Sequence, residues 1–310
     1  MTARPAVFIL NPVARRAPSL ARLRAAIDRA AGPALQPEIR ITERPAHAIE
    51  LAREAEAGGA GLIFACGGDG TINEVLNGLR NPSTQVGVIP AGTADVWAAE
   101  AGIPGGFVRA IRAQLGAQPL RLDVGRAGER RFLLMAGLGL DAAAAAAVSP
   151  RLKRLTGRAA YIAAGARVGA LYHGHRFALR FDDGPPRELR ANMIVIGNTR
   201  LYGSAAAITS EASAVDGELD CVIFRGGGPI PALRGLSLML LRRHLRSGAV
   251  LFERARSIRI EPLDDRPPLL QVDGDVVDTV GGFPSEFSIE PLAVTMLVPN
   301  ADRPVFQLRR

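Results

Sequence analysis

Residues 61–74, GLIFACGGDGTINE, decide how the first part of the chain folds. The apolar run at 61–65 has the length of a buried strand, and Gly67-Gly68-Asp69-Gly70 closes it. Thr71 then opens a helical stretch and has Glu74 three residues later, which predicts a capping box. A strand that enters a helix through a glycine turn is typical of a parallel α/β sheet.

The same alternation of strand and helix continues on both sides of this stretch. Short strands alternating with helices predict a doubly wound parallel sheet with helices on both faces. The predicted strands are 6–10, 38–42, 61–65 and 86–89, and the predicted helices are 18–31, the segment opened by Pro45, and the segment after residue 71.

The pattern changes near residue 120, where strand-like segments crowd together. Turn residues such as Asp183-Gly184 and Asp273-Gly274 separate several of them, which predicts an antiparallel, sandwich-like sheet. We therefore expect an α/β domain at 1–122, completed by 299–310 if the C-terminus returns to it, and a β-rich domain at 123–298. The predicted strands are 120–125, 131–136, 176–182, 188–197, 218–224, 256–261, 268–273 and 286–297, with helical stretches near 151–171 and 230–246.

Composition excludes several classes of protein. Of the 310 residues, 48% are hydrophobic and 22% are charged, so we expect a chain that buries a core. The net charge of +8 favours anionic partners such as nucleotide phosphates and acidic lipid headgroups. Basic residues are not interleaved with aromatic ones and no zinc-ligand spacing occurs, so we expect no nucleic-acid partner.

Location is inferred from the cysteines and from hydropathy. Cys66 and Cys221 are the two cysteines, which favours a reducing compartment over a disulfide framework. The apolar N-terminus reads as a strand and not as a signal peptide, and no apolar run is long enough to span a bilayer. We expect a cytoplasmic protein.

The glycine loop at 67–70 carries the strongest chemical signal. Consecutive glycines let backbone N–H groups approach a phosphate chain, and the following helix N-terminus favours negative charge. Asp69 repels an anion by itself, so it fits a residue that binds a metal ion or accepts a proton. Glu74 either reaches a nucleotide or completes the capping box. The plainer alternative is a tight turn followed by an ordinary cap.

A second loop, Pro90-Ala91-Gly92-Thr93-Ala94-Asp95, follows the next strand. Open α/β sheets bind ligands at the carboxyl ends of neighbouring strands. Asn11, Arg15 and Arg16 follow the first strand and should line the same edge, where either arginine could hold phosphate oxygens.

Three of these motifs together resemble the signature of the diacylglycerol kinase catalytic domain, which sphingosine and ceramide kinases share. They are Asn11-Pro12, GGDGTINE at 67–74 and PAGT at 90–93. The likeness extends along nearly the whole chain in the same order. Further matches are Thr42 with Pro45 and Ala46, Leu155–Tyr161, Asn198, Tyr202-Gly203, DGELD at 216–220 and Asp273-Gly274-Asp275.

The resemblance implies a two-domain kinase that uses ATP with Mg²⁺ and phosphorylates a lipid alcohol at a membrane surface. It implies that Asp275 accepts the proton of the lipid hydroxyl, that Asp69 takes part in the chemistry within an acidic network with Mg²⁺, and that Asp216 holds a second, structural metal with backbone carbonyls. The implied ATP-binding residues are Asn11, Thr42, Gly67, Gly68, Asp69, Gly70, Thr71, Ile72, Asn73, Glu74, Gly92 and Thr93.

Two departures from the family pattern leave alternatives open. Asp95 replaces an amide and Asp275 replaces the usual glutamate, one methylene longer. A catalytically weak lipid- or nucleotide-binding module is therefore one alternative. An NAD kinase-like small-molecule kinase is the other, because that family shares the Gly-Gly-Asp-Gly loop and a two-domain layout. The amphipathic stretch Pro231–Arg246 is either a packed surface helix or a peripheral contact with the inner face of a membrane. The sequence leaves the oligomeric state open, with a homodimer among the options.

Overall fold

A computed structural model describes residues 4–147, 167–202, 207–241, 243–277, 283 and 285–308. The chain divides into two compact units, which are described separately below. Unit 1 comprises Met1–Asp123 with Pro291–Leu308, and unit 2 comprises Val124–Glu290. The expected helix at 151–171 and the motif at Leu155–Tyr161 lie wholly or mostly outside the described residues. Among the described helices, none combines the length and the apolar character needed to cross a membrane.

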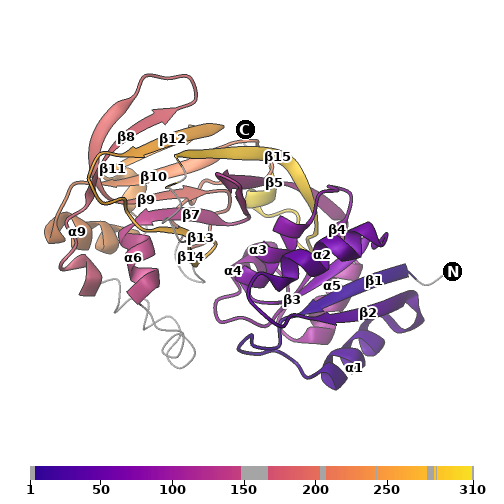
Figure 1. The fold of residues 1–310 in the computed structure, drawn as a ribbon. Coiled ribbons are helices and arrows are strands. Elements are labelled where there is room, and N and C mark those ends of the chain that lie inside the picture. The colour runs from indigo at the N-terminus through magenta and orange to yellow at the C-terminus, as the bar shows by residue number, and fades with distance from the viewer. Residues whose placement is uncertain are drawn as a thin grey trace. The chain divides into compact units, whose positions relative to one another are not determined.

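Unit 1 is built on a parallel sheet in the order β2-β1-β3-β4 (Figure 1). The end of β15 pairs in parallel with β4, where Thr295 lies opposite Gln85. All six residues of β3 and the last five of β1 are buried, as expected for strands covered on both faces. The strands are β1 (Arg4–Leu10), β2 (Leu35–Ile41), β3 (Leu62–Gly67), β4 (Gln85–Pro90) and β15 (Glu286–Leu297).

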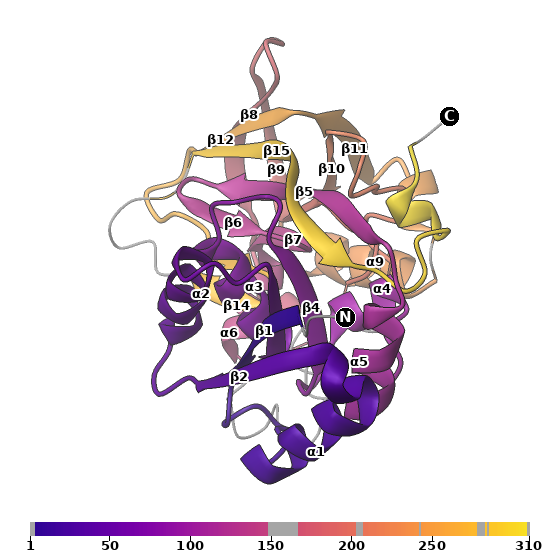
Figure 2. The same ribbon diagram turned by 90° about the vertical axis from the view of Figure 1, so that its right-hand side faces the viewer.

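Helices lie on both faces of this sheet, with α1 and α5 on one side and α2 and α3 on the other (Figure 2). On the first side, Phe8 stacks on Phe64 with ring centroids 4.7 Å apart, and Leu23 of α1 and Ile111 of α5 join the same cluster. The helices are α1 (Leu20–Ala31), α2 (His47–Ala57), α3 (Asp69–Gly78), α4 (Val96–Ala101) and α5 (Phe107–Leu115), with short 3-10 turns η1 (Gly32–Ala34) and η3 (Pro304–Phe306). Phe306 of η3 packs edge-on against the buried Trp97, with ring centroids 5.8 Å apart.

Unit 2 is an antiparallel β structure in which β9 pairs with β7, β8 and β10. Its core consists of apolar side chains from these and neighbouring strands, including the fully buried Phe132, Phe177 and Phe287. The strands are β5 (Pro119–Ala127), β6 (Arg130–Phe132), β7 (Met135–Gly139), β8 (His175–Phe181), β9 (Arg187–Gly197), β10 (Leu219–Arg225), β11 (Val250–Ala255), β12 (Ser257–Pro262), β13 (Leu270–Val272) and β14 (Asp275–Val277). Its described helices are α6 (Leu140–Ala147), α9 (Pro229–Leu240) and the 3-10 turn η2 (His244–Arg246).

The predicted fold class is confirmed, with a parallel α/β sheet followed by an antiparallel β part. Several element boundaries were wrong. The expected strand at 131–136 is two strands, β6 and β7, and 268–273 is the first arm of the β13–β14 hairpin. Strand β11 and helices α4 and α5 were missed. Helix α4 is only six residues long, which is too short for a helical period to show, whereas α5 is amphipathic and its pattern was overlooked.

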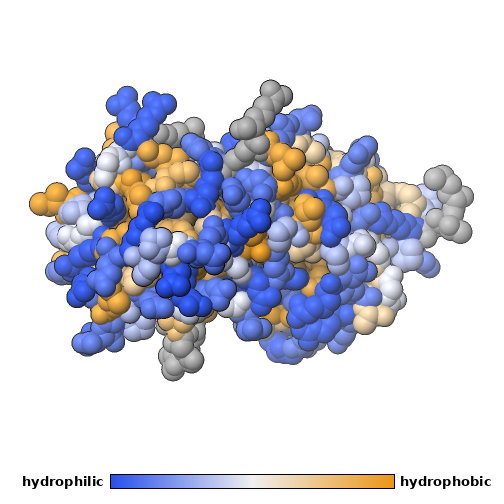
Figure 3. All heavy atoms as spheres, turned by 90° about the horizontal axis from the view of Figure 1, so that it is seen from above, coloured by the Kyte–Doolittle hydropathy of each residue, from blue (hydrophilic) through white to orange (hydrophobic). Residues whose placement is uncertain are grey.

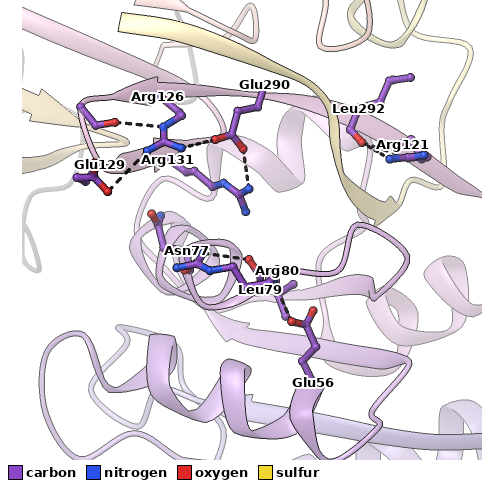
Figure 4. Close-up of polar contacts among 11 residues, drawn as sticks. Glu56, Asn77, Leu79, Arg80, Arg121, Arg126, Glu129, Arg131, Glu290 and Leu292 are labelled. Carbon is purple, nitrogen blue, oxygen red and sulfur yellow. Dashed lines mark hydrogen bonds and ion pairs between the residues drawn. The ribbon is translucent and has the colours of Figure 1, made fainter. Parts of the chain in front are cut away.

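Strands β5 and β15 each run from one unit into the other, and polar contacts hold them (Figure 4). In unit 2, Glu290 pairs with Arg126 at 2.7 Å and with Arg131 at 2.6 Å. In unit 1, the Arg121 guanidinium donates to the carbonyl of Leu292, whose N–H donates to Asp123. These bonds satisfy the backbone at Leu292, which has a left-handed φ of 49°.

The face seen in Figure 3 carries mixed hydrophilic and hydrophobic residues, with the hydrophilic ones in many separate clusters. This distribution is ordinary for a folded surface, much of which is contributed by apolar atoms.

Candidate active site

The carboxyl ends of the parallel strands in unit 1 bring the predicted loops together. Asn11 follows β1, Thr42 follows β2, and the Gly67-Gly68 turn ends β3. Their backbones are joined, since the Asn11 N–H donates to Cys66 and the Thr42 N–H donates to Leu10, at 3.0 and 2.9 Å. The Asn11 side chain also donates to Thr71 Oγ1 at 3.0 Å, so the first strand end is tied to helix α3.

The two glycine loops touch through their backbones. A Cβ atom added at Gly92 would lie 2.6 Å from the Gly68 Cα and 2.7 Å from Asp95 Oδ1. A Cβ atom added at Gly67 would lie 2.3 Å from Thr71 Oγ1. These glycines are therefore required for close packing, and the loops that follow β3 and β4 form one surface.

Asp69 is the first residue of α3, and its carboxylate reaches the second loop. It accepts hydrogen bonds from the N–H groups of Val96 and Trp97, both at 3.0 Å, and thereby caps the start of α4. A carboxylate has about four lone-pair positions, so capping leaves room for a cation. A Mg²⁺ that takes one or two carboxylates, phosphate oxygens and water fits such a donor.

Glu74 does not form the expected capping box with Thr71. Helix α3 begins at Asp69, and its N-cap residue is Gly68, which has no side chain to cap it. The Glu74 carboxylate accepts from the N–H groups of Ala46 and Ala48 instead, at 3.1 and 3.2 Å, and so caps the start of α2. Sequence spacing missed this role because the donors lie 26 and 28 residues away in the chain.

Asp95 stands where the family usually has an amide side chain, and it forms bonds within the second loop and with Arg16. Its carboxylate accepts from the Gly92 N–H at 2.8 Å and pairs with Arg16, whose guanidinium also donates to the Gly92 carbonyl at 3.1 Å. Burial raises the pKa of Asp95 despite the opposing effects of the Gly92 N–H and Arg16. Arg16 is thus bound to Asp95 and to the Gly92 carbonyl. Arg15, the other arginine expected to reach phosphate oxygens, is exposed.

The remaining predicted nucleotide ligands of unit 1 differ in exposure. Thr71, Ile72 and Asn73 are buried in the first turn of α3, and Thr42 is 9% exposed. Gly70 is half-buried and Thr93 is exposed. A nucleotide can touch the exposed members directly, whereas the buried side chains shape the loop from behind.

Asp273 and Asp275 lie in unit 2 on the β13–β14 hairpin. Asp273 and Gly274 both have positive φ, 50° and 88°, as a two-residue hairpin turn of the primed type requires. The buried Asp273 carboxylate accepts from three backbone N–H groups, those of residues 133, 134 and 135, at 2.8–3.0 Å. Asp273 is thus a structural acceptor that holds the β6–β7 connection.

Asp275 is available to solvent. Its side chain is 52% exposed and forms an ion pair with Arg130 at 3.4 Å. An exposed carboxylate of this kind is able to accept a proton from a hydroxyl placed beside it.

Asp216 lies in a tight turn before β10. Its Oδ1 accepts from the Glu218 N–H at 3.1 Å, and the intervening Gly217 has a φ of 74°. Among the described residues, no group of three or more His, Cys, Asp or Glu side chains is placed to hold a metal ion. The predicted site at Asp216 would combine its carboxylate with backbone carbonyls, and it stays a prediction.

A buried polar network behind the hairpin was not predicted. Asp141 of α6 is 3% exposed and accepts from Tyr202 Oη and from Gln271 Nε2, the latter at 2.8 Å. Gln271 Oε1 in turn accepts from the Gly274 N–H at 2.6 Å. Asp141 follows the apolar strand β7 and precedes a run of alanines, which is the one sequence signal that sets it apart.

Comparison with known proteins gives matches over nearly the whole chain. The profile of the diacylglycerol kinase catalytic domain matches residues 5–127, and the profile of the YegS C-terminal NAD kinase beta sandwich-like domain matches residues 135–298. A Pseudomonas putida protein named "Probable lipid kinase YegS-like" is 31% identical over 84% of this chain and 85% of its own length. The Bacillus subtilis protein named "Diacylglycerol kinase" is 26% identical over 77% of this chain and 78% of its own.

Solved structures give the same fold. A crystal structure from Bacillus anthracis str. Sterne, described as a diacylglycerol kinase, aligns with a TM-score of 0.71 at 19% identity and covers 95% of this chain and 96% of its own. An NAD kinase from Archaeoglobus fulgidus in complex with ATP aligns with a TM-score of 0.50 at 15% identity, over 96% and 94% of the two chains. At these identities the alignments concern the fold alone.

Proposed function

Because the chain belongs to the diacylglycerol kinase catalytic-domain family and is a phosphotransferase with an alcohol group as acceptor, we propose that it transfers the γ-phosphoryl group of ATP to a lipid hydroxyl in a Mg²⁺-dependent reaction. Diacylglycerol is the first acceptor to test, since one relative is named "Diacylglycerol kinase". The observation that carries the proposal is the contact between the two glycine loops. It places the N-terminus of α3 and the Asp69 carboxylate together at one edge of the sheet.

ATP is proposed to bind in unit 1 along the loops that follow β1, β2, β3 and β4. The start of α3 offers a positive dipole end to phosphate oxygens, and Gly67 and Gly68 let a phosphate approach the backbone. Arg15 supplies a positive side chain on the loop after β1. The proposed domain division assigns this role to residues 1–122, completed by 299–310, and lipid binding to residues 123–298.

The chemistry that the residues are proposed to perform is positioning and proton transfer. Mg²⁺ would be held by Asp69 and would offset charge on the phosphate oxygens. Asp275 accepts the proton of the lipid hydroxyl, for which its exposed carboxylate is suited. Asp216 is proposed to hold the structural metal beside β10. The protein is proposed to work in the cytoplasm, at the inner face of a membrane.

The decisive experiment incubates the purified protein with labelled ATP and a panel of lipid alcohols in mixed micelles, with products identified by mass. We expect one phosphorylated lipid whose formation requires Mg²⁺. Calorimetry with Mg·ATP should show binding by the folded protein. If properly folded protein has no affinity for Mg·ATP, the proposal is wrong.

The same panel separates the alternatives. Phosphorylation of NAD⁺ in the absence of lipid turnover would assign a small-molecule kinase. ATP binding without turnover of any acceptor would assign a weak binding module, and Asp275→Glu then becomes informative. A large gain in rate from that substitution would identify a site degraded by its shorter carboxylate.

A further inference from the structure

Helix α9 of unit 2 presents several large apolar side chains to solvent. Its small residues Ala232 and Gly235 face inward, and a Cβ atom added at Gly235 would lie 2.9 Å from the ring of Phe224 on β10. An ordinary surface helix places its large apolar side chains against the core. Here Ala232 and Gly235 allow close packing against β10, Leu236 and Met239 are half-buried, and three large apolar side chains remain exposed.

Three large side chains form this outer apolar face. Ile230 is 80% exposed, Leu233 is 42% exposed, and Leu241, directly after the helix, is 66% exposed. Their spacing of three and eight residues, with the exposed Ser237 between them, puts them on one side of the helix. Exposed apolar side chains that gather on one face mark a surface that contacts another molecule.

A basic hollow adjoins this face. Arg234, Arg243 and Arg246, together with Leu238, Ser247 and Gly248, line an open hollow of about 580 Å³. In the described part of the chain, no carboxylate pairs with any of these three guanidinium groups. Three unneutralised arginines around one hollow create a positive potential that favours an anion there.

One alternative explains part of this arrangement. Arg243 follows the C-terminal end of α9, where a cation is stabilised by the helix dipole. That effect accounts for neither Arg234 in the middle of the helix nor the exposed Ile230 and Leu241. The apolar face and the arginines together are complementary to a partner that has both an apolar region and negative charge.

We propose that the outer face of α9, formed by Ile230, Leu233 and Leu241 with the three-arginine hollow, docks on an anionic lipid bilayer. The apolar side chains enter the boundary between headgroups and acyl chains, and the hollow takes a lipid phosphate. The net charge of +8 adds long-range attraction to the same surface.

The test is sedimentation of the full chain with vesicles of phosphatidylglycerol or of phosphatidylcholine, without ATP. We expect binding to phosphatidylglycerol that weakens as salt is added, and little binding to phosphatidylcholine. Arg243→Ala/Arg246→Ala should bind phosphatidylglycerol vesicles about thirty-fold more weakly, since each arginine near the surface contributes about fivefold. Ile230→Ser/Leu233→Ser should also weaken binding, at unchanged charge.

A matched control removes two positive charges elsewhere on unit 2. Arg180 and Arg259 are exposed neighbours on β8 and β12, so Arg180→Ala/Arg259→Ala has the same net charge as the hollow variant. We expect it to bind vesicles like the parent. If the hollow variant and this control lost vesicle binding equally, overall charge would explain the effect and the proposal would be overturned. Parent-like binding by both α9 variants, or hollow-dependent binding of soluble glycerol phosphate with no preference for vesicles, would overturn it as well. Because no turnover is measured, the result is independent of the proposed kinase activity.

Discussion

Replacing Asp69 by asparagine should lower both kinase activity and folding stability, for two separable reasons. The carboxylate caps α4 by accepting the N–H groups of Val96 and Trp97, each at 3.0 Å. In Asp69→Asn the amide oxygen keeps one of these bonds, but the amide nitrogen faces the other N–H. Loss of one capping bond costs about 1–2 kcal/mol, which lowers the melting temperature by about 3–6 °C.

The effect on catalysis should be much larger. Asparagine keeps the size of the side chain but removes the negative charge proposed to hold Mg²⁺. Removing one electrostatic contact to a transition state lowers the rate by about 100- to 1000-fold, and we expect a loss of at least this size. The assay is labelled-ATP turnover with the preferred lipid in mixed micelles, and stability is measured by urea unfolding followed by circular dichroism.

Ser19→Ala is the control for stability loss by itself. Ser19 caps α1 by accepting the Arg22 N–H at 3.4 Å, so its removal costs about 1 kcal/mol. That variant should keep parental turnover. Near-parental turnover by Asp69→Asn would refute the proposed role of Asp69, and unchanged stability would refute the capping argument.

Three further predictions concern the two loops and the hairpin. Gly92→Ala should destabilise the protein by about 1–3 kcal/mol in thermal unfolding, because its Cβ would lie 2.6 Å from the Gly68 backbone, whereas Gly105→Ala, with nothing within 4 Å, should not. Asp95→Asn should gain stability relative to the parent as pH rises. Because burial raises the pKa of Asp95 in the folded state, the parent loses stability above the unfolded value of 3.8, while asparagine does not titrate; urea unfolding at pH 4 and pH 7 tests this, and a constant difference contradicts it. Asp273→Ala leaves three buried N–H groups without their acceptor and should cost at least about 3 kcal/mol; a loss below about 1 kcal/mol would contradict the assigned role.

The parallel sheet of unit 1 was predictable because its strands are recognisable from residues that are close together in the sequence. The strands β1, β3 and β4 are short apolar runs that end in asparagine or glycine turns, and the amphipathic α1 has helical spacing. The order of the motifs along the chain was also enough to indicate the family, since three such motifs rarely occur in the same order by chance. Strands β6 and β7 were merged because Asp273, which separates them by binding the backbone between, lies about 140 residues away.

The site was predictable in its location but not in its bonding. Sequence placed Asn11, the Gly67–Gly70 loop and Gly92 at one edge, because parallel strands share their carboxyl ends. It assigned Glu74 either to ATP or to a capping box in its own helix, whereas the side chain caps α2. It left Asp95 as an unexplained departure, whereas Arg16 provides a counter-charge from 79 residues away.

By itself the sequence determined the strands of the parallel sheet, the glycine turns at their ends, and which carboxylates stand beside those turns. All three follow from steric limits and periodicity within a few residues. Only the tertiary structure decided which backbone amides each carboxylate binds, and that Ile230, Leu233 and Leu241 are exposed at α9 while Gly235 packs against Phe224 of β10. Those outcomes depend on which distant groups arrive at the same place, and a buried polar group must bind whatever donor is there.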